Sequence, residues 1–358
     1  MGEYAFFSGE SRNLENRMIN NNKRTFLKSI VAASAVLTTC ALPIQAADKS
    51  HAYILTTATT GGTFYPVGVA IATLTKIKLE PKHKVSLSAI SSAGSGENVK
   101  LLRENQAQFA ILQGLYGAWA WNGEGSVKSP RRNLRSVTML WQNVEHFTVN
   151  SNRVKTGTVT DLKQFKGAKF SIGKRNSGTE GSGRHILSAV GIDTDKIFNV
   201  VYLGYGPSAD ALQNGNIKGM NIPAGVPVSA IARAFAVLGN KITVLDFTDE
   251  QLGQVNSTYP LWNRYVIPAN TYPNQKNAIN TIAQPNFLVV REGVDEEDVY
   301  LITKTIYENL PFLHAIHKAT KAIALEKAIE GLPMPLHPGA ARYYQEQDIE
   351  IPRNMLVK

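Results

Sequence analysis

Cysteine is almost absent from this sequence, because the 358 residues contain only Cys40. That residue falls inside the apolar N-terminal stretch described below, so a chain processed after it has no cysteine at all. Such a chain cannot form disulfides, use a thiol nucleophile or bind a metal through thiolates. A protein without thiols also avoids oxidation, which suits an oxidising compartment such as the periplasm.

Long apolar runs are lacking as well. The apolar stretch at residues 29–42 spans about 14 residues, whereas a membrane-spanning helix needs roughly 20. It follows Lys23, Arg24 and Lys28 and precedes small residues at Ala46 and Ala47. This order predicts a secretory signal peptide within residues 1–47, cleaved near Ala46/Ala47, and export to the periplasm. The alternative is an N-terminal membrane anchor.

Two details refine the predicted export signal. Met18 is a natural start codon for it, which marks residues 1–17 as a suspected mis-assigned extension. Lys23 stands where a twin-arginine signal has its first arginine, and this favours the Sec route.

Acidic residues are outnumbered, with 28 Asp and Glu against 38 Lys and Arg and a net charge of +10. Without residues 1–47 these counts fall to 25 and 33, a balance of +8. A basic protein can attract nucleic acid, anionic membranes or small acids. The densest basic cluster, residues 129–136, lacks interleaved aromatic residues, so we expect no nucleic-acid partner and a surface that steers anions.

The sequence after residue 47 alternates between strand-like and helix-like segments, which predicts α/β layers with parallel strands. In a first series, strands at residues 52–58, 84–91 and 108–114 flank helices at 65–77 and 96–106. A second series has strands at 169–174, 199–204 and 242–247 and helices at 181–191 and 208–216; a strand at 286–290 and a helix at 295–310 follow. No low-complexity linker separates the series. We therefore expect two lobes joined by crossing strands, one of them within residues 138–150.

The stretch ATTGGTFYPVG, residues 58–68, lies where the first strand turns into a helix. Pro66 suits the first helical turn, Thr63 can cap the helix, and Gly61 and Gly62 let the backbone approach a ligand. The helix N-terminus favours an anion, and α/β sheets bind ligands at this end of their strands. The alternative is a plain strand-to-helix turn with a capping threonine.

Two further loops share this design. ISSAGSGENV, residues 90–99, follows the second strand, and GKRNSGTEGSG, residues 173–183, follows the first strand of the second series. Three loops rich in glycine and hydroxyls, from two lobes, can converge on a cleft between those lobes.

Signatures of enzymes and cofactors are incomplete. GTEGSGRH, residues 178–185, has the glycines of a P-loop, but Arg184 and His185 replace its lysine and hydroxyl residue. Ser182 lacks the G-x-S-x-G spacing of a nucleophile elbow, and the histidines lack metal-ligand spacing. We therefore expect no enzyme activity, no cofactor and no metal site.

In combination, the segments resemble one known family. Six segments occur in the order seen in TAXI-family solute receptors: TTGGTFYPVGVAIATL, AGSGENVKLLRENQAQFAILQ, FSIGKRNSGTEGSGRHIL, SADALQNGNIKGM, PNFLVVREGVDEEDVYLITKTIYENL and PLHPGAARYYQEQDIEIP. These are the extracytoplasmic binding subunits of TRAP-type transporters. The resemblance covers roughly residues 52–352.

The resemblance implies an α/β, two-lobe periplasmic-binding-protein fold of type II-like topology, with the ligand in the interlobe cleft. Lobe I would comprise residues 48–143 plus 282–358, and lobe II residues 144–281. The lobes would close on a small carboxylate similar to glutamate, 2-oxoglutarate or a dicarboxylate, and TRAP membrane permease subunits driven by an ion gradient would receive it. The alternatives are a sensory ligand-binding subunit of the periplasm and an exported hydrolase of small anionic substrates.

The resemblance also implies ligand-binding residues in each loop. They are Thr60, Gly61, Gly62, Thr63 and Tyr65 in the first loop, Ser92, Ser95 and Asn98 in the second, Gln113 at the third strand end, and Ser177, Gly178, Thr179 and Glu180 in the second lobe. Tyr65 would cover the apolar part of the ligand.

Two departures from the family pattern concern the pocket. Gly114 and Leu115 replace a common Ser-Asp pair, and Lys174-Arg175-Asn176 replaces a small Ala-Pro-Gly turn. The two cations can hold a second carboxylate, with Arg175 as the candidate clamp, or face water. Glu180 either faces a cation or amine of the ligand or caps its helix N-terminus.

Overall fold

The computed structural model describes residues 50–357. The predicted signal peptide, Cys40 and the cleavage region lie outside the described residues. Within the described part, no helix combines the length and the apolar character that crossing a bilayer requires.

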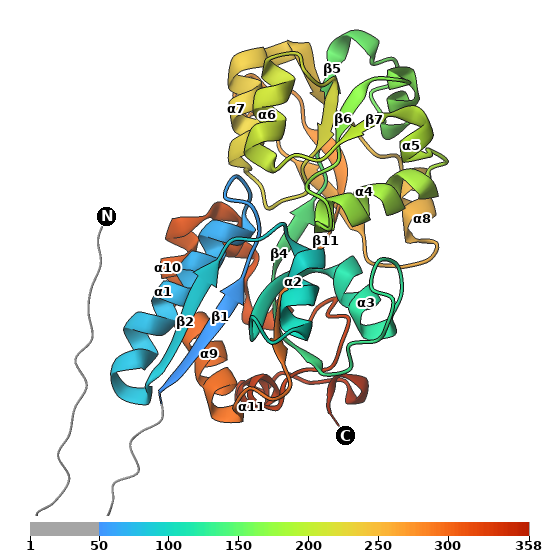
Figure 1. Cartoon of the computed structure of the whole chain (residues 1–358). Coiled ribbons are helices and arrows are strands. Elements are labelled where there is room, and N and C mark those ends of the chain that lie inside the picture. The colour runs from blue at the N-terminus through green and yellow to red at the C-terminus, as the bar shows by residue number, and fades with distance from the viewer. Residues whose placement is uncertain (1–49, 358) are drawn as a thin grey trace, which may run out of the picture. The chain divides into compact units, whose positions relative to one another are not determined.

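The first sheet contains six strands in the order β10-β11-β3-β1-β2, with β4 also paired to β11. β1 is parallel to β2 and β3, whereas β11 is antiparallel to β3, β4 and β10. The strands are β1 (His51–Thr56), β2 (Val85–Ile90), β3 (Phe109–Gln113), β4 (Leu134–Val144), β10 (Asn263–Ile267) and β11 (Ile279–Arg291). The helices of this lobe are α1 (Phe64–His83), α2 (Ser95–Arg103), α3 (Gly114–Asn122), α9 (Glu296–Glu308), α10 (Leu310–Ile316) and α11 (Pro338–Glu346), as Figure 1 shows.

The second sheet has the order β7-β6-β8-β5-β9, with β6 parallel to β7 and β8 and β5 antiparallel to β8 and β9. Its strands are β5 (Phe147–Asn150), β6 (Lys169–Ser171), β7 (Asn199–Val201), β8 (Gly219–Asn221) and β9 (Ile242–Val244). Its helices are α4 (Gly178–Ala189), α5 (Thr194–Ile197), α6 (Tyr205–Gln213), α7 (Ser229–Leu238) and α8 (Asp249–Asn256). Short 3-10 turns occupy residues 151–153, 159–165, 239–241, 318–322, 325–327 and 353–355.

The two sheets repeat one topology. In each, the first strand lies between the second and third, and an antiparallel strand follows the third: β2-β1-β3-β11 in one and β7-β6-β8-β5 in the other. This arrangement confirms the predicted two-lobe α/β fold with type II-like strand order. The lobe boundaries at residues 143 and 281 stay a prediction; β4 ends at Val144 and β11 begins at Ile279. β10, inside the range predicted for lobe II, is hydrogen-bonded into the first sheet.

The connection between the lobes runs along β4 and β11, which lie between the two groups of helices in Figure 1. The Val144 N–H donates to the Ala224 carbonyl at 2.9 Å, and Thr281 Oγ1 donates to the Glu145 carbonyl at 2.8 Å. The expected crossing within residues 138–150 is therefore confirmed, since β4 continues into β5 there.

β11 is longer than the predicted strand at residues 286–290. The prediction missed the first half of β11 because that half contains polar residues and a proline. Pro285 lacks an N–H, but β3 pairs with β11 only from Asn286 onward. At Pro285 the strand therefore needs a partner only on the β4 side.

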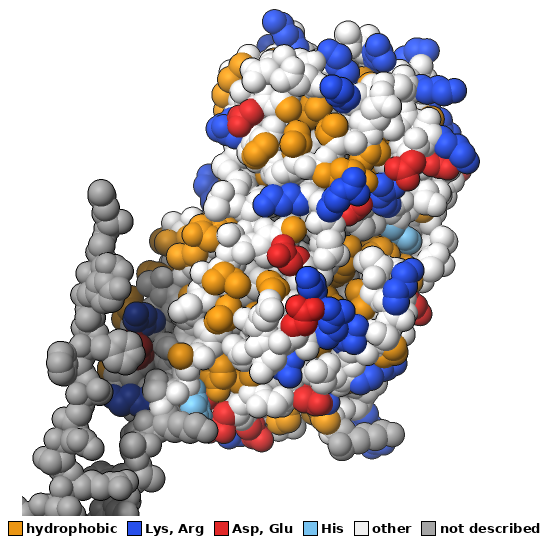
Figure 2. Space-filling view, viewed as in Figure 1, with side chains coloured by type: hydrophobic (Ala, Val, Ile, Leu, Met, Phe, Trp, Pro, Cys, Tyr) orange, Lys and Arg blue, Asp and Glu red, His pale blue; other side chains and the backbone are white. Residues whose placement is uncertain are grey.

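On the face shown in Figure 2, lysine and arginine side chains are spread over both lobes, and acidic side chains lie among them. This view agrees with the scattered basic residues of the sequence.

Helix α11 packs closely on α9 in the first lobe. A Cβ added to Gly339 would lie 2.1 Å from the Glu296 carbonyl oxygen and 2.7 Å from the Tyr300 backbone nitrogen. Backbone atoms cannot move aside as a flexible side chain does, so this contact requires glycine.

We predict that Gly339→Ala lowers the free energy of unfolding by about 1–3 kcal/mol, because overpacking forces the two helices apart. Gly253→Ala in α8 is the matched control, since nothing lies within 4 Å of its added Cβ. The control should raise stability by about 0.5–1 kcal/mol through helix propensity. Urea unfolding measures both values, and a Gly339→Ala protein as stable as wild type would contradict the packing described here.

Candidate functional site

A cavity lies between the two lobes, and both contribute to its wall. The space not filled by protein atoms amounts to about 430 Å³, part of it open to solvent. Half of the predicted ligand-binding residues line it: Gly62, Thr63, Ser95, Gln113, Ser177, Gly178 and Thr179.

Helix N-termini converge on this cavity. Its lining includes the first residue, or the residue just before it, of α1, α2, α3, α4 and α6. The first N–H groups of a helix have no acceptor within the helix, and the helix dipole places partial positive charge there. The convergence follows from the topology, because these helices all start at carboxyl ends of strands that meet at the cleft.

The charge of the lining has one sign. Among the described residues that border the cavity, only Lys174 has a charged side chain, and none of them has a carboxylate. Together with the helix N-termini, this gives the cavity a positive potential.

Two serines keep their hydroxyl protons available for a ligand. Ser95 Oγ accepts from the Gln113 N–H at 3.1 Å, and Ser177 Oγ accepts from the Glu180 N–H at 3.1 Å. Because each hydroxyl acts as an acceptor toward the backbone, its own proton can point into the cavity.

Thr63 does not cap α1, contrary to the prediction. Its backbone is already helical, with φ −84° and ψ −30°, and its side chain makes no cap hydrogen bond. Oγ1 instead donates to the Gly225 carbonyl of the other lobe at 3.1 Å. An N-cap side chain reaches the N–H groups of the first turn from an extended backbone, and Thr63 lacks that conformation.

Three other residues of the first loop lie beside the cavity rather than in its lining. Thr60 borders a neighbouring hollow with Pro227. The Gly61 carbonyl accepts from Ser229 Oγ at 3.1 Å, which ties the loop to the second lobe. Tyr65 is half-buried and absent from the lining, and Phe64 takes the place expected for it.

Ser92 and Asn98 lie outside the cavity lining and form hydrogen bonds within the first lobe. Asn98 Nδ2 donates to the carbonyls of Thr57 and Ile111 at 2.7 and 2.9 Å, and its Oδ1 accepts from Thr56 Oγ1 at 2.8 Å. Ser92 Oγ lies 2.6 Å from the same oxygen. The fully buried Asn98 side chain thus has no capacity left for a ligand, and it fixes the loop after β2 to β1 and β3.

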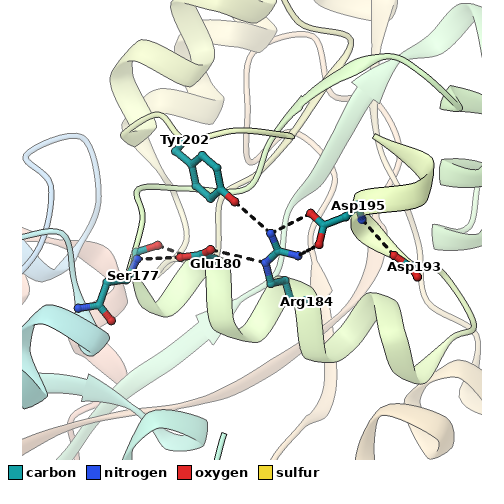
Figure 3. A network of polar contacts seen from close by, with 7 residues as sticks. Ser177, Glu180, Arg184, Asp193, Asp195 and Tyr202 are labelled. Atoms are coloured by element: carbon teal, nitrogen blue, oxygen red, sulfur yellow. Dashed lines mark hydrogen bonds and ion pairs between the residues drawn. The ribbon is translucent and has the colours of Figure 1, made fainter. Parts of the chain in front are cut away.

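Glu180 belongs to a separate surface network on α4, shown in Figure 3, and Arg175 contacts Tyr202 of that network. Glu180 Oε2 accepts from the Asn176 N–H at 2.7 Å, and Glu180 Oε1 lies 3.5 Å from Arg184 Nε. Arg184 also donates to Asp195 at 2.8 Å. The guanidinium of Arg175 stacks 3.8 Å above the Tyr202 ring. Both predicted residues therefore line a different hollow, and Lys174 takes the place expected of Arg175.

The interpretation of the sequence missed Thr59, Asn143 and Tyr205, which line the cavity. Tyr205 OH donates to the Pro223 carbonyl at 2.6 Å and lies 2.8 Å from Thr179 Oγ1. Tyr205 begins the helix that follows β7, so it fits the same strand-to-helix pattern by which the other loops were predicted. Asn143 had no such signal, because it lies inside the crossing strand β4.

A chain of amide contacts crosses the cavity floor. Gln113 Nε2 donates to the Gly178 carbonyl at 2.9 Å, and Asn143 Nδ2 donates to Gln113 Oε1 at 3.1 Å. A Cβ added to Gly178 would lie 2.7 Å from Gln113 Oε1, so only glycine permits this approach. The lobes therefore touch through specific polar groups.

Two buried titratable residues occupy the turn from β4 to β5. Glu145 accepts from Asn221 Nδ2 at 2.9 Å, and burial raises its pKa to about 7. Burial lowers the pKa of His146 to about 4. His146 Nδ1 faces the carbonyls of Val144 and Ile222 and so carries the proton, while Nε2 accepts from Tyr272 OH at 2.8 Å.

We predict that Glu145→Gln gains stability relative to wild type as pH rises from 4.5 to 7. In this range the unfolded wild-type chain ionises Glu145 while the folded chain keeps it protonated, so rising pH destabilises the wild type. The gain should reach at most about 3 kcal/mol, since one pKa unit corresponds to about 1.4 kcal/mol. Between pH 6.5 and pH 4 the unfolded chain protonates His146 while the folded chain keeps it neutral, so falling pH destabilises the wild type. The effects of Glu145 and His146 therefore nearly cancel where the two pH ranges overlap, and the wild-type stability should be nearly flat there.

Urea unfolding of both proteins between pH 4 and pH 8 measures this difference. Glu250→Gln, at an exposed carboxyl of α8, is the control and should show no comparable trend. A constant difference between Glu145→Gln and wild type would mean that Glu145 is ionised in the folded protein.

Several solved structures are similar to this chain at low identity. The periplasmic aliphatic sulphonate binding protein SsuA from Escherichia coli is 14% identical, with 84% of this chain and 91% of that chain covered and a TM-score of 0.42. PhnD1 from Prochlorococcus marinus in complex with methylphosphonate is 14% identical over 77% and 89% of the two chains, with a TM-score of 0.43. A TctC solute binding protein from Polaromonas is 15% identical over 84% and 98%, with a TM-score of 0.42.

These similarities are too distant to carry an argument about the site. The NMT1-like family model matches residues 55–347. This span includes all the loops around the cavity. It also includes both sheets, except for the start of β1. The chain belongs to the NMT1-like family.

Proposed function

We propose that this protein is an extracytoplasmic solute receptor that binds a small carboxylate in the interlobe cavity. The observation that carries the proposal is the convergence of helix N-termini and Lys174 on a cavity whose lining has no carboxylate. Such a site attracts an anion and repels a cation. Its function is binding without chemistry.

The donors fit a carboxylate in number and kind. Ser95 and Ser177 keep their hydroxyl protons, and the N–H groups of Gly178 and Thr179 begin α4 beside them. Lys174 adds a mobile positive charge from the second lobe. Phe64 and Ala224 supply apolar surface for the carbon skeleton.

Lobe closure is the step that completes the site. Three of the hydrogen bonds between the lobes run from Gln113 to Gly178, from Thr63 to Gly225, and from the Glu97 N–H to the Asn176 carbonyl at 3.0 Å. Separation of the lobes opens the cavity, and bending can occur where β4 passes into β5. The closed form then presents a continuous surface to a membrane partner.

The membrane partner in this proposal is a set of TRAP-type permease subunits, as the resemblance to TAXI receptors implies. The chain would be exported to the periplasm and would bind glutamate-like, 2-oxoglutarate-like or dicarboxylate-like solutes. Its cargo would enter the cell by an ion gradient.

The proposal is tested by isothermal calorimetry of protein that has been unfolded, dialysed and refolded to remove any bound solute. The panel contains dicarboxylates, keto acids, hydroxy acids and amino acids, with sulfonates and phosphonates because the same donors hold any oxyanion. Binding of a carboxylate that is recovered unchanged supports the receptor. Preference for another anion class, conversion of the compound, or no binding would contradict it.

We predict that Lys174→Gln raises the Kd for the bound carboxylate about fivefold or more, since a charge-assisted hydrogen bond is worth about 1 kcal/mol or more. Arg175→Gln is the matched control, because its guanidinium lies over Tyr202 and outside the cavity lining. Its Kd should stay within about twofold of wild type. Equal effects of the two substitutions would assign them to general surface charge.

A further inference from the structure

The floor of the cavity contains a hydrogen-bond acceptor without a donor. The Gly178 carbonyl can only accept, so the Gln113 amide must direct its nitrogen toward that carbonyl and its oxygen toward Asn143. Asn143 must then direct its own nitrogen toward Gln113. Asn143 Oδ1 is left without a partner among the residues the structure describes, although the side chain is only 1% exposed.

An unpaired buried acceptor is costly. Leaving one unsatisfied costs about 1–3 kcal/mol, and native proteins satisfy most such groups. Asn143 lines the cavity, so a solute bound there can supply the missing donor.

Three hydroxyls of the lining, those of Thr63, Thr179 and Tyr205, already donate their protons within the protein. Thr63 Oγ1 donates to the Gly225 carbonyl. Tyr205 OH donates to the Pro223 carbonyl, so Thr179 Oγ1 must donate to Tyr205 in turn. Toward a ligand, both threonines now offer lone pairs only. The cavity therefore combines donors for an anion with acceptors for an N–H or O–H group.

The charge of the lining decides which donor fits. An ammonium group needs a carboxylate nearby, and the cavity lining contains none, whereas Lys174 and the helix N-termini oppose a second cation. Glu145 lies two residues beyond Asn143 but is not in the lining. A neutral hydroxyl satisfies the same acceptors without adding charge.

We propose that Asn143 is a specificity-determining residue and that the solute is a small hydroxy acid, whose carboxylate takes the helix N-termini and whose hydroxyl donates to Asn143 Oδ1. This inference rests on the proposed function and narrows its ligand class. A site built to bind a hydroxyl discriminates strongly against analogues that lack it, because its polar group is then left unpaired.

The test compares sets of acids that share a carbon skeleton and differ at carbon 2. One set is lactate, alanine, pyruvate and propionate; the second is malate, aspartate, oxaloacetate and succinate. The third is 2-hydroxyglutarate, glutamate, 2-oxoglutarate and glutarate. Within the set of fitting length, calorimetry should give the hydroxy acid a Kd at least tenfold lower than each of its three analogues.

Each outcome of this series has a distinct meaning. Tightest binding of the amino, keto or unsubstituted acid would overturn the hydroxy-acid inference and leave the receptor in place. No binding of any of the twelve acids, with binding of a sulfonate or phosphonate, would overturn the carboxylate proposal itself.

Asn143→Asp tests the residue. The new carboxylate favours an ammonium donor, so the ratio of amino-acid Kd to hydroxy-acid Kd should fall at least tenfold. Asn150→Asp is the matched control: it has the same unpaired carboxamide oxygen but lies in β5 outside the cavity lining, and it should leave the ratio unchanged.

A second variant covers the case in which Asn143→Asp does not fold. Asn143→Ala removes the acceptor without adding charge and should bind the hydroxy acid and its unsubstituted analogue with nearly equal Kd. Retention of the wild-type preference in either variant would contradict the role of Asn143.

Discussion

The hydrogen bond from Gln113 to the Gly178 carbonyl determines much of how the cavity is organised. It joins the end of β3 to the start of α4 and so connects the two lobes at the cavity floor. It also orients the Gln113 amide, which in turn orients Asn143. The absence of a Cβ at position 178 is the condition for this contact. This glycine therefore permits one of the contacts that join the lobes and that orient the polar groups of the floor.

The repeated topology of the sheets explains why the site is positive. In both sheets the parallel strands end at the cleft, and the helices that follow β1, β2, β3, β6 and β7 begin there. The positive ends of several helices are thus brought together without a cluster of arginines or lysines. Serine hydroxyls beside them complete the donors, while the net charge of the protein stays spread over its surface.

Much of the fold could be predicted from the sequence, because alternating strands and helices leave strong periodic signals. The crossing at residues 138–150 and the three loops around the cavity were found in this way. The sequence did not show which polar residues of each loop line the cavity and which form hydrogen bonds within the fold. Asn98 and Ser95 look alike as polar residues near one helix start, but only the register of β1 and β3 turns Asn98 toward their carbonyls.

The neighbouring cations posed the same difficulty. Lys174 and Arg175 are adjacent in sequence, and their assignment depends on Tyr202, which follows β7 and on whose ring Arg175 stacks. Asn143 lies inside a strand that carries no loop signal at all. Contacts between distant segments decide such roles, and a single sequence does not contain them.

The interlobe hydrogen bonds have a consequence for kinetics. Gln113, Thr63 and the backbone of Glu97 bond to the opposite lobe around the cavity, so in the proposed receptor the lobes would separate only after these bonds break. The residence time of a solute would then follow the opening rate of the lobes. Tight and weak solutes would differ chiefly in how far they slow that opening, and a membrane partner that separates the lobes would release either of them at once.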